Sequence, residues 1–235
     1  MNNTIYEDLI VTLDQVISAD DVKEISPSGN DFTFSYHIHD TIPEGYKEGV
    51  YSVMENLTDI LPIKSHFSFY YAPVYIWAGD VPESYLSLNI GPGTMIGGPG
   101  AQDGSGWIRW MQVQIYPSDW FYGYPCRYNA IAHEYLHLTQ IAYSPNGSAV
   151  WMTEGSASVF MNLYSQQYYD CDWLGENGFY SRIDEQLIFD PQLLEDQYNP
   201  SDNGYASSMF LILALSKELQ KIGYSEDMSF NLILK

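Results

Sequence analysis

The segment from Ala130 to Tyr143 reads AIAHEYLHLTQIAY, and it decides how the rest of the chain is interpreted. It places His133 and His137 four residues apart, with Glu134 directly after the first histidine. Residues four apart lie on the same face of a helix, one turn from each other. A helix here would direct two imidazoles toward one metal ion, with a carboxylate beside it, as in an H-E-x-x-H zinc site. The chain has only five histidines, so this pattern favours a metal site over two histidines that merely share one face of a buried helix.

The next segment offers a third ligand. Sixteen residues separate the second histidine from Glu154, which lies within the run Trp151–Ala157, reading WMTEGSA. Ser144–Gly147 predicts a turn and Ser148 an N-cap, so we expect two antiparallel helices that bring Glu154 back over the histidines. Two histidines and one glutamate leave a fourth position for water, as a catalytic zinc ion requires. For Glu154 alone, the alternative role is a carboxylate that stabilises a helix start. The two histidines nearby favour the role of a metal ligand. Gly155 would let a neighbouring helix approach closely.

Together, the H-E-x-x-H motif and the downstream W-x-x-E-G-x-A motif resemble the gluzincin metallopeptidases. The residues of the second motif are most similar to those of aminopeptidase-like and collagenase-like members. The resemblance covers roughly residues 107 to 222. The resemblance implies that His133, His137 and Glu154 hold Zn²⁺. It also implies that Glu134 takes a proton from the metal-bound water and passes it to the leaving amine.

Two features of the chain differ from known zincin groups and limit the group that it resembles. The metzincin group needs Gly three residues and His six residues after the second ligand, where this chain has Gln140 and Tyr143. No glutamate occupies the strand expected before the zinc helix, so the group that anchors a substrate amine in aminopeptidases is missing. The chain therefore favours an endopeptidase over an aminopeptidase.

The resemblance also implies a tyrosine that stabilises the oxyanion at the start of a later helix. Tyr205 matches the Y-x-x-G pattern of that helix, with Ser208 in the position of the glycine. We expect Tyr205 to donate to the tetrahedral oxyanion, with Tyr198 as the second candidate. The alternative is that Tyr205 is a half-buried residue at a helix start.

The strand expected before the zinc helix covers residues 107–116 and reads WIRWMQVQIY. In zincins the strand at this place is an edge strand that lines the cleft and pairs with extended substrate backbone, so we expect an edge strand here, with Trp107, Trp110 and Gln112 as candidate substrate-binding residues. An ordinary interior or edge strand without such a role remains an equal alternative.

Hydrophobic periodicity predicts an α+β fold. Helices are expected over 5–22, 44–61, 130–143, 148–164, 181–189 and 203–221, and strands over 32–38, 67–77 and 107–116. Residues 89–106 are expected to form a long glycine-rich loop. We expect a zincin-like architecture: an N-terminal α/β lobe (1–124) with a small twisted mixed sheet, a mainly helical lobe (125–235), and an active-site cleft between them.

The charge balance excludes several partners. The chain carries 30 Asp and Glu against nine Lys and Arg, for a formal net charge of −21. Such a surface repels the phosphates of nucleic acids and anionic membranes. Asp170–Asp172 and Asp196–Asp202 offer carboxylates for structural Ca²⁺, but neither matches an EF-hand loop, so the sequence gives this ion no position.

Cysteine usage and the N-terminus bear on localisation. Cys126 and Cys171 are the only cysteines, and the sequence leaves open whether they form a disulfide or remain two buried thiols. No apolar run of 18 residues predicts a membrane span, and Met1–Thr4 does not begin a signal peptide. The low lysine content and the Tyr, Asn, Ser and Gly enrichment favour an extracellular or cell-surface protein, with a cytoplasmic protein as the alternative.

These patterns lead to one expectation and one alternative for function. We expect a zinc-dependent peptidase that acts on peptides or proteins, in an oligomeric state the sequence does not define. The alternative is a catalytically inactive zincin-like protein that binds a protein or glycan. Glu134 favours the enzyme, since a purely structural zinc site has no need of that carboxylate.

Overall fold

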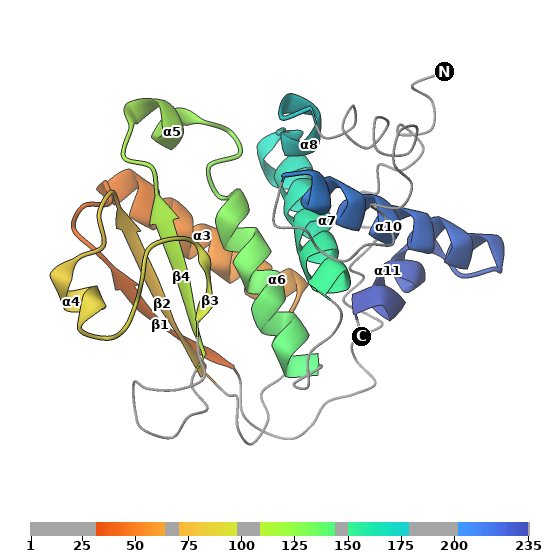
Figure 1. Ribbon diagram of the computed structural model, residues 1–235, viewed down its shortest axis with the longest axis horizontal. Helices are drawn as coiled ribbons and strands as arrows, with labels where there is room; N and C mark the ends of the chain where they lie inside the picture. Colours follow the sequence, from red (N-terminus) through yellow and green to blue (C-terminus); the bar gives the residue numbers. More distant parts are fainter. Residues whose placement is uncertain (1–31, 64–70, 98–108, 144–149, 179–201, 235) are drawn as a thin grey trace. The chain divides into compact units, whose positions relative to one another are not determined.

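The computed structural model describes residues 32–63, 71–97, 109–143, 150–178 and 202–234 of the chain (Figure 1). The chain divides into two compact units, one of residues 25–145 and one of residues 1–24 with 146–235. The sequence placed this boundary at 124/125, whereas the division at 145/146 leaves the H-E-x-x-H segment with the strands. The helices expected over 5–22 and 181–189 lie outside the described residues.

The unit of residues 25–145 contains a mixed four-stranded sheet. Its strands are β1 (Thr33–Ile38), β2 (Tyr71–Ala78), β3 (Met95–Gly97) and β4 (Trp110–Ile115). Their order is β1-β2-β4-β3, with β1, β2 and β4 parallel and β3 antiparallel to β4. Helices accompany the sheet, so the expected α+β class is confirmed.

Two details of the sheet differ from the sequence expectation. The glycine-rich segment does not form only a loop, because it contributes the short strand β3. The expectation that residues 107–116 form an edge strand is wrong, because β4 pairs with β2 on one side and β3 on the other. Gly97 permits this extra pairing, since a Cβ atom there would lie 1.9 Å from the Trp110 ring.

Helices α3 and α6 cover one face of the sheet. The helices of this unit are α3 (Glu44–Ile60), α4 (Glu83–Leu86), α5 (Asp119–Gly123) and α6 (Asn129–Tyr143). Helix α3 connects β1 to β2 and supplies the long crossover that parallel strands require. Its Tyr51 ring packs against Tyr36 of β1, and Tyr135 of α6 packs against Phe34 of the same strand. Phe34 and Tyr36 are two residues apart and therefore point to the same side.

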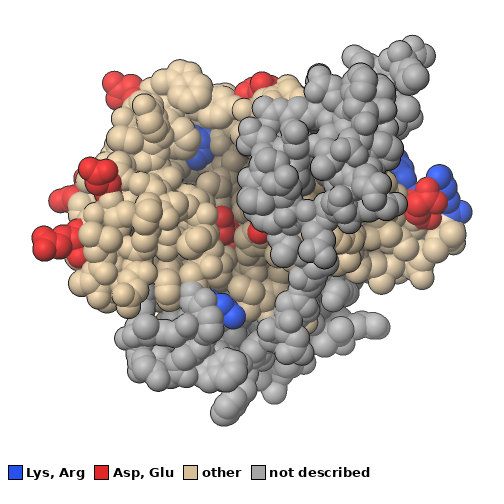
Figure 2. Space-filling view, in the orientation of Figure 1, with Lys and Arg blue, Asp and Glu red and all other residues tan. Residues whose placement is uncertain are grey.

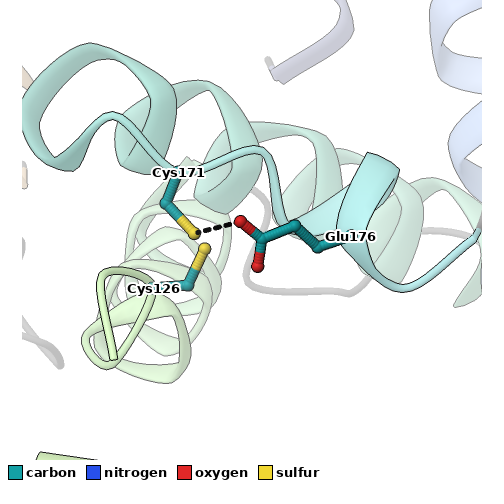
Figure 3. A group of neighbouring side chains, drawn as sticks. All are labelled: Cys126, Cys171 and Glu176. Atoms are coloured by element: carbon teal, nitrogen blue, oxygen red, sulfur yellow. Dashed lines mark hydrogen bonds between the residues drawn. The ribbon is translucent and has the colours of Figure 1, made fainter. Parts of the chain in front are cut away.

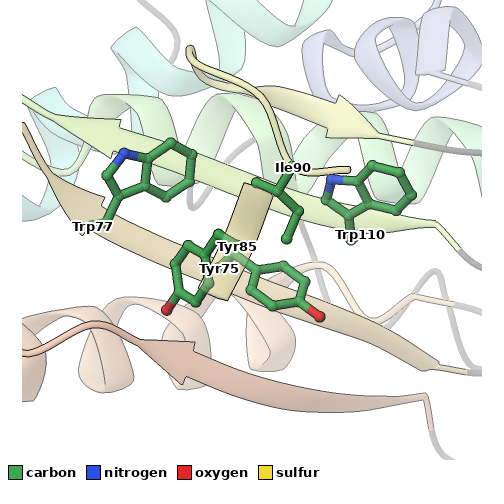
Figure 4. Packing of buried hydrophobic residues seen from close by; sticks show 5 residues of the cluster. All are labelled: Tyr75, Trp77, Tyr85, Ile90 and Trp110. Carbon is green, nitrogen blue, oxygen red and sulfur yellow. The ribbon is translucent and has the colours of Figure 1, made fainter. Parts of the chain in front are cut away.

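The opposite face of the sheet carries an aromatic cluster (Figure 4). Its buried members come from β2, β4, α4 and the segment after α4, and they are Tyr75, Trp77, Tyr85, Ile90 and Trp110. The Tyr85 hydroxyl donates to the carbonyl of His37 at 2.7 Å and so ties α4 to β1. Burial raises the pKa of Tyr85 to about 12, which keeps this donor protonated at neutral pH.

The described residues of the second unit form helices. These are α7 (Val150–Tyr169), α8 (Trp173–Glu176), α10 (Asp202–Lys221) and α11 (Glu226–Leu234). Helix α10 packs against α7 and α11. The helices expected over 148–164 and 203–221 are thus confirmed, and α11 is additional. Gly223, with φ of 104°, ends the turn after α10.

The described surface shows no broad basic patch on the face drawn in Figure 2, where Asp and Glu are more frequent than Lys and Arg. The described helices include none with the length and apolar character needed to cross a membrane.

Candidate metal centre

Contacts at its start and middle fix helix α6 within its unit. Just before the helix, Tyr128 packs against α3 at Gly49, where a Cβ atom would lie 1.7 Å from the Tyr128 hydroxyl. In the middle of the helix, the Tyr135 hydroxyl donates to the carbonyl of Leu61 at 2.7 Å. Burial raises the pKa of Tyr135 well above its usual value, so this hydroxyl remains a donor. Helix α6 is therefore anchored on both sides of His133.

The two histidines of α6 face each other as their spacing predicts. Their Nε2 atoms are 3.0 Å apart, and both side chains are half-buried. Two Zn–N bonds of 2.0–2.1 Å at the tetrahedral angle place the nitrogens about 3.3 Å apart. His133 and His137 thus present their Nε2 atoms at nearly the separation that one zinc ion requires.

A third side chain contacts this pair. Gln140 is one turn after His137, and its Oε1 lies 2.7 Å from His137 Nδ1. Because an amide oxygen only accepts, Nδ1 is the donor in this contact, and on a neutral ring Nε2 then keeps its lone pair. The sequence pattern alone did not identify Gln140 as a group that orients an imidazole.

Glu134 is buried, with 4 % of its surface exposed. Burying a carboxylate is costly unless cations or hydrogen-bond donors compensate it. A divalent cation on the neighbouring histidines would provide such compensation. Glu134 thus has the burial expected of a proton acceptor in a water-restricted site.

Glu154 of α7 completes a group of three possible metal ligands. His133, His137 and Glu154 each offer one ligand atom, these atoms all lie within 4.8 Å of one another, and each residue is half-buried. Two imidazole nitrogens and one carboxylate oxygen are the donor set of many catalytic zinc sites. The residues therefore fit zinc in donor type and number.

The described residues contain one other group of this kind, formed by Cys126, Cys171 and Glu176 (Figure 3). Both cysteines are disulfide-bonded, and the chain has no others. Glu176 Oε1 lies 3.8 Å from Cys171 Sγ. A metal ion needs thiolates as ligands, and a disulfide provides none. This group is therefore a disulfide beside a carboxylate, which resolves the alternative that the sequence left open.

Gly155, next to Glu154, allows α7 and α10 to pack closely. A Cβ atom at Gly155 would lie 2.5 Å from the backbone oxygen of Ser208 in α10. The expectation that this glycine permits a close helix approach is confirmed. Tyr205 lies in the first turns of α10, three residues before Ser208, so its backbone is in the helix that packs beside the Glu154 segment. The Tyr205 side chain and all of Tyr198 lie outside the described residues.

The residues proposed to bind substrate have other contacts. Trp110 and Gln112 are buried in β4, and Trp110 Nε1 donates to Gln112 Oε1 at 2.9 Å. Gln112 Nε2 donates to the carbonyls of Gly91 and Gly93 at 3.0 and 3.2 Å. These side chains hold the glycine-rich segment against the sheet. Trp107 lies outside the described residues.

The acidic stretch considered for calcium has a capping role. Asp172 accepts from the backbone of Gly175 at 3.2 Å and caps α8, and Asn162 donates to the same carboxylate. Among the described residues, both groups of possible metal ligands contain His or Cys, and neither consists of acidic side chains alone, as a calcium site would. Residues 196–201 lie outside the described part of the chain.

Comparison with known proteins identifies no relative. No protein-family model, no curated protein and no solved structure matches the chain.

Proposed function

We propose that this chain is a zinc-dependent peptidase with a zincin-like fold. The observation that carries the proposal is the His133–His137 pair, with Nε2 atoms 3.0 Å apart and a Glu154 ligand atom in the same group. The mixed sheet beside α6 is compatible with the fold that the gluzincin resemblance implies.

Each residue has a distinct role in the proposed reaction. His133, His137 and Glu154 would hold Zn²⁺, which supplies Lewis-acid polarisation of the scissile carbonyl and lowers the pKa of water. Glu134 would accept the proton of the attacking water and return it to the leaving amine. Tyr205 would donate a hydrogen bond to the oxyanion.

Peptide binding is proposed at the sheet. Among the described strands, β1 and β3 are the two edges of the sheet, and the outer edge of β3, which lies near α6, could pair with an extended peptide backbone. Such pairing binds the main chain of the substrate and needs no free substrate terminus, so we favour an endopeptidase. The disulfide supports an extracellular or cell-surface location, because disulfides persist in oxidising compartments.

The proposal is tested by measuring zinc content and the hydrolysis of an unstructured protein such as casein. We expect one zinc ion per chain, hydrolysis that stops on chelation, and recovery when Zn²⁺ is restored. A chain that binds no zinc when supplied with the metal would contradict the proposal. Stoichiometric zinc without cleavage of diverse substrates would favour the binding protein instead.

A further inference from the structure

We propose that Gln140 is the positioning residue that prepares His137 for the metal by fixing its tautomer and ring orientation. The inference rests on the proposed zinc site and adds a residue that the gluzincin motif does not contain.

Two hydrogen bonds within α6 favour one arrangement of protons on a neutral His137 ring. Gln140 Oε1 lies 2.7 Å from Nδ1, and His133 Nε2 lies 3.0 Å from Nε2. A neutral imidazole carries one proton, and an amide oxygen can only accept. Nδ1 of His137 therefore donates to Gln140, and its Nε2 accepts from His133. The nitrogen that faces the second histidine is then the one with a lone pair, as metal binding requires.

Loss of this acceptor would have a direct chemical consequence. Without a partner at Nδ1, the proton of His137 can move to Nε2 and occupy the lone pair that the metal needs. The His137 ring would also lose the hydrogen bond at Nδ1 that, together with the contact at Nε2, fixes its orientation. Groups that orient metal-bound histidines in this way contribute about 10–100-fold to metal affinity.

The amide suits this site for an electrostatic reason. Gln140 accepts the hydrogen bond without a charge and cannot take the imidazole proton. It lies on the same helix as His137, one turn later, where helical spacing brings the two side chains together.

The test compares Gln140→Leu, which removes the acceptor, with Gln140→Glu, which retains an oxygen acceptor. Gln220→Leu in α10 is the control, because Gln220 is also a half-buried helical glutamine with a polar contact one turn away. The first measurement is the tautomer of His137 in the metal-free protein, by ¹⁵N NMR of the ring at a pH where imidazole is neutral. The second is Zn²⁺ affinity by competition with a chelator.

We expect the Nδ1–H tautomer in the wild type, in Gln140→Glu and in Gln220→Leu, and a mixture in Gln140→Leu. Zinc affinity should fall about 10–100-fold in Gln140→Leu, recover in Gln140→Glu and stay unchanged in Gln220→Leu. An unchanged tautomer and unchanged affinity in Gln140→Leu would overturn the proposal, as would an equal loss in the control. If the wild type binds no zinc, the peptidase proposal fails, while the tautomer still decides the role of Gln140.

Discussion

Replacing Glu134 with Gln is expected to reduce peptide hydrolysis by about 10²–10⁴-fold while Zn²⁺ stays bound. The substitution keeps the size and polarity of the side chain but removes the ability to accept a proton from water. Glu134 is buried and lies beside the two proposed histidine ligands without being one of them, so the metal site should persist. The measurements are the rate of casein cleavage and the zinc content of the same sample.

A matched substitution separates this effect from a general loss of charge. Glu48 is an exposed glutamate of α3, and Glu48→Gln should leave both hydrolysis and zinc content at the wild-type level. Hydrolysis by Glu134→Gln at the wild-type rate would remove Glu134 from its proposed role.

Replacing His137 with Ala is expected to lower zinc affinity by more than about 100-fold, beyond the loss of an orienting group, and to abolish hydrolysis. The substitution removes one of three protein ligands and the partner of both His133 and Gln140. Affinity is measured by competition with a chelator, and circular dichroism checks that α6 remains folded.

His39→Ala provides the control for this loss. His39 is half-buried in the same unit and contacts Thr41 and Asp40, but it does not belong to the candidate metal group. Its replacement should leave zinc affinity unchanged. Wild-type zinc affinity in His137→Ala would show that the ion binds elsewhere.

Local sequence patterns predicted those helices and strands in which the hydrophobic periodicity extends over many residues. Helix α3 follows from buried residues at spacings of three and four, including Val50, Val53 and Leu57. Strand β3 has only three residues, and it exists because β4 pairs with it from a different part of the chain. No local pattern could have revealed it, and so β4 was mistaken for an edge.

Some contacts of the candidate site follow from local spacing in the sequence, and others depend on the tertiary fold. The facing of His133 and His137 follows from helical spacing alone. The Gln140 contact could have been found, because an acceptor one turn after a histidine lies on the same helix face. The disulfide between Cys126 and Cys171 depends on tertiary proximity, which spacing along the chain does not encode.

The most direct test of the proposed metal centre is an experimental structure of the zinc-loaded protein with anomalous diffraction at the zinc absorption edge. We expect one zinc peak about 2.0–2.2 Å from His133 Nε2, His137 Nε2 and a carboxylate oxygen of Glu154, with a fourth position open to water. A peak elsewhere, or a Glu154 carboxylate beyond bonding distance of the ion, would contradict it.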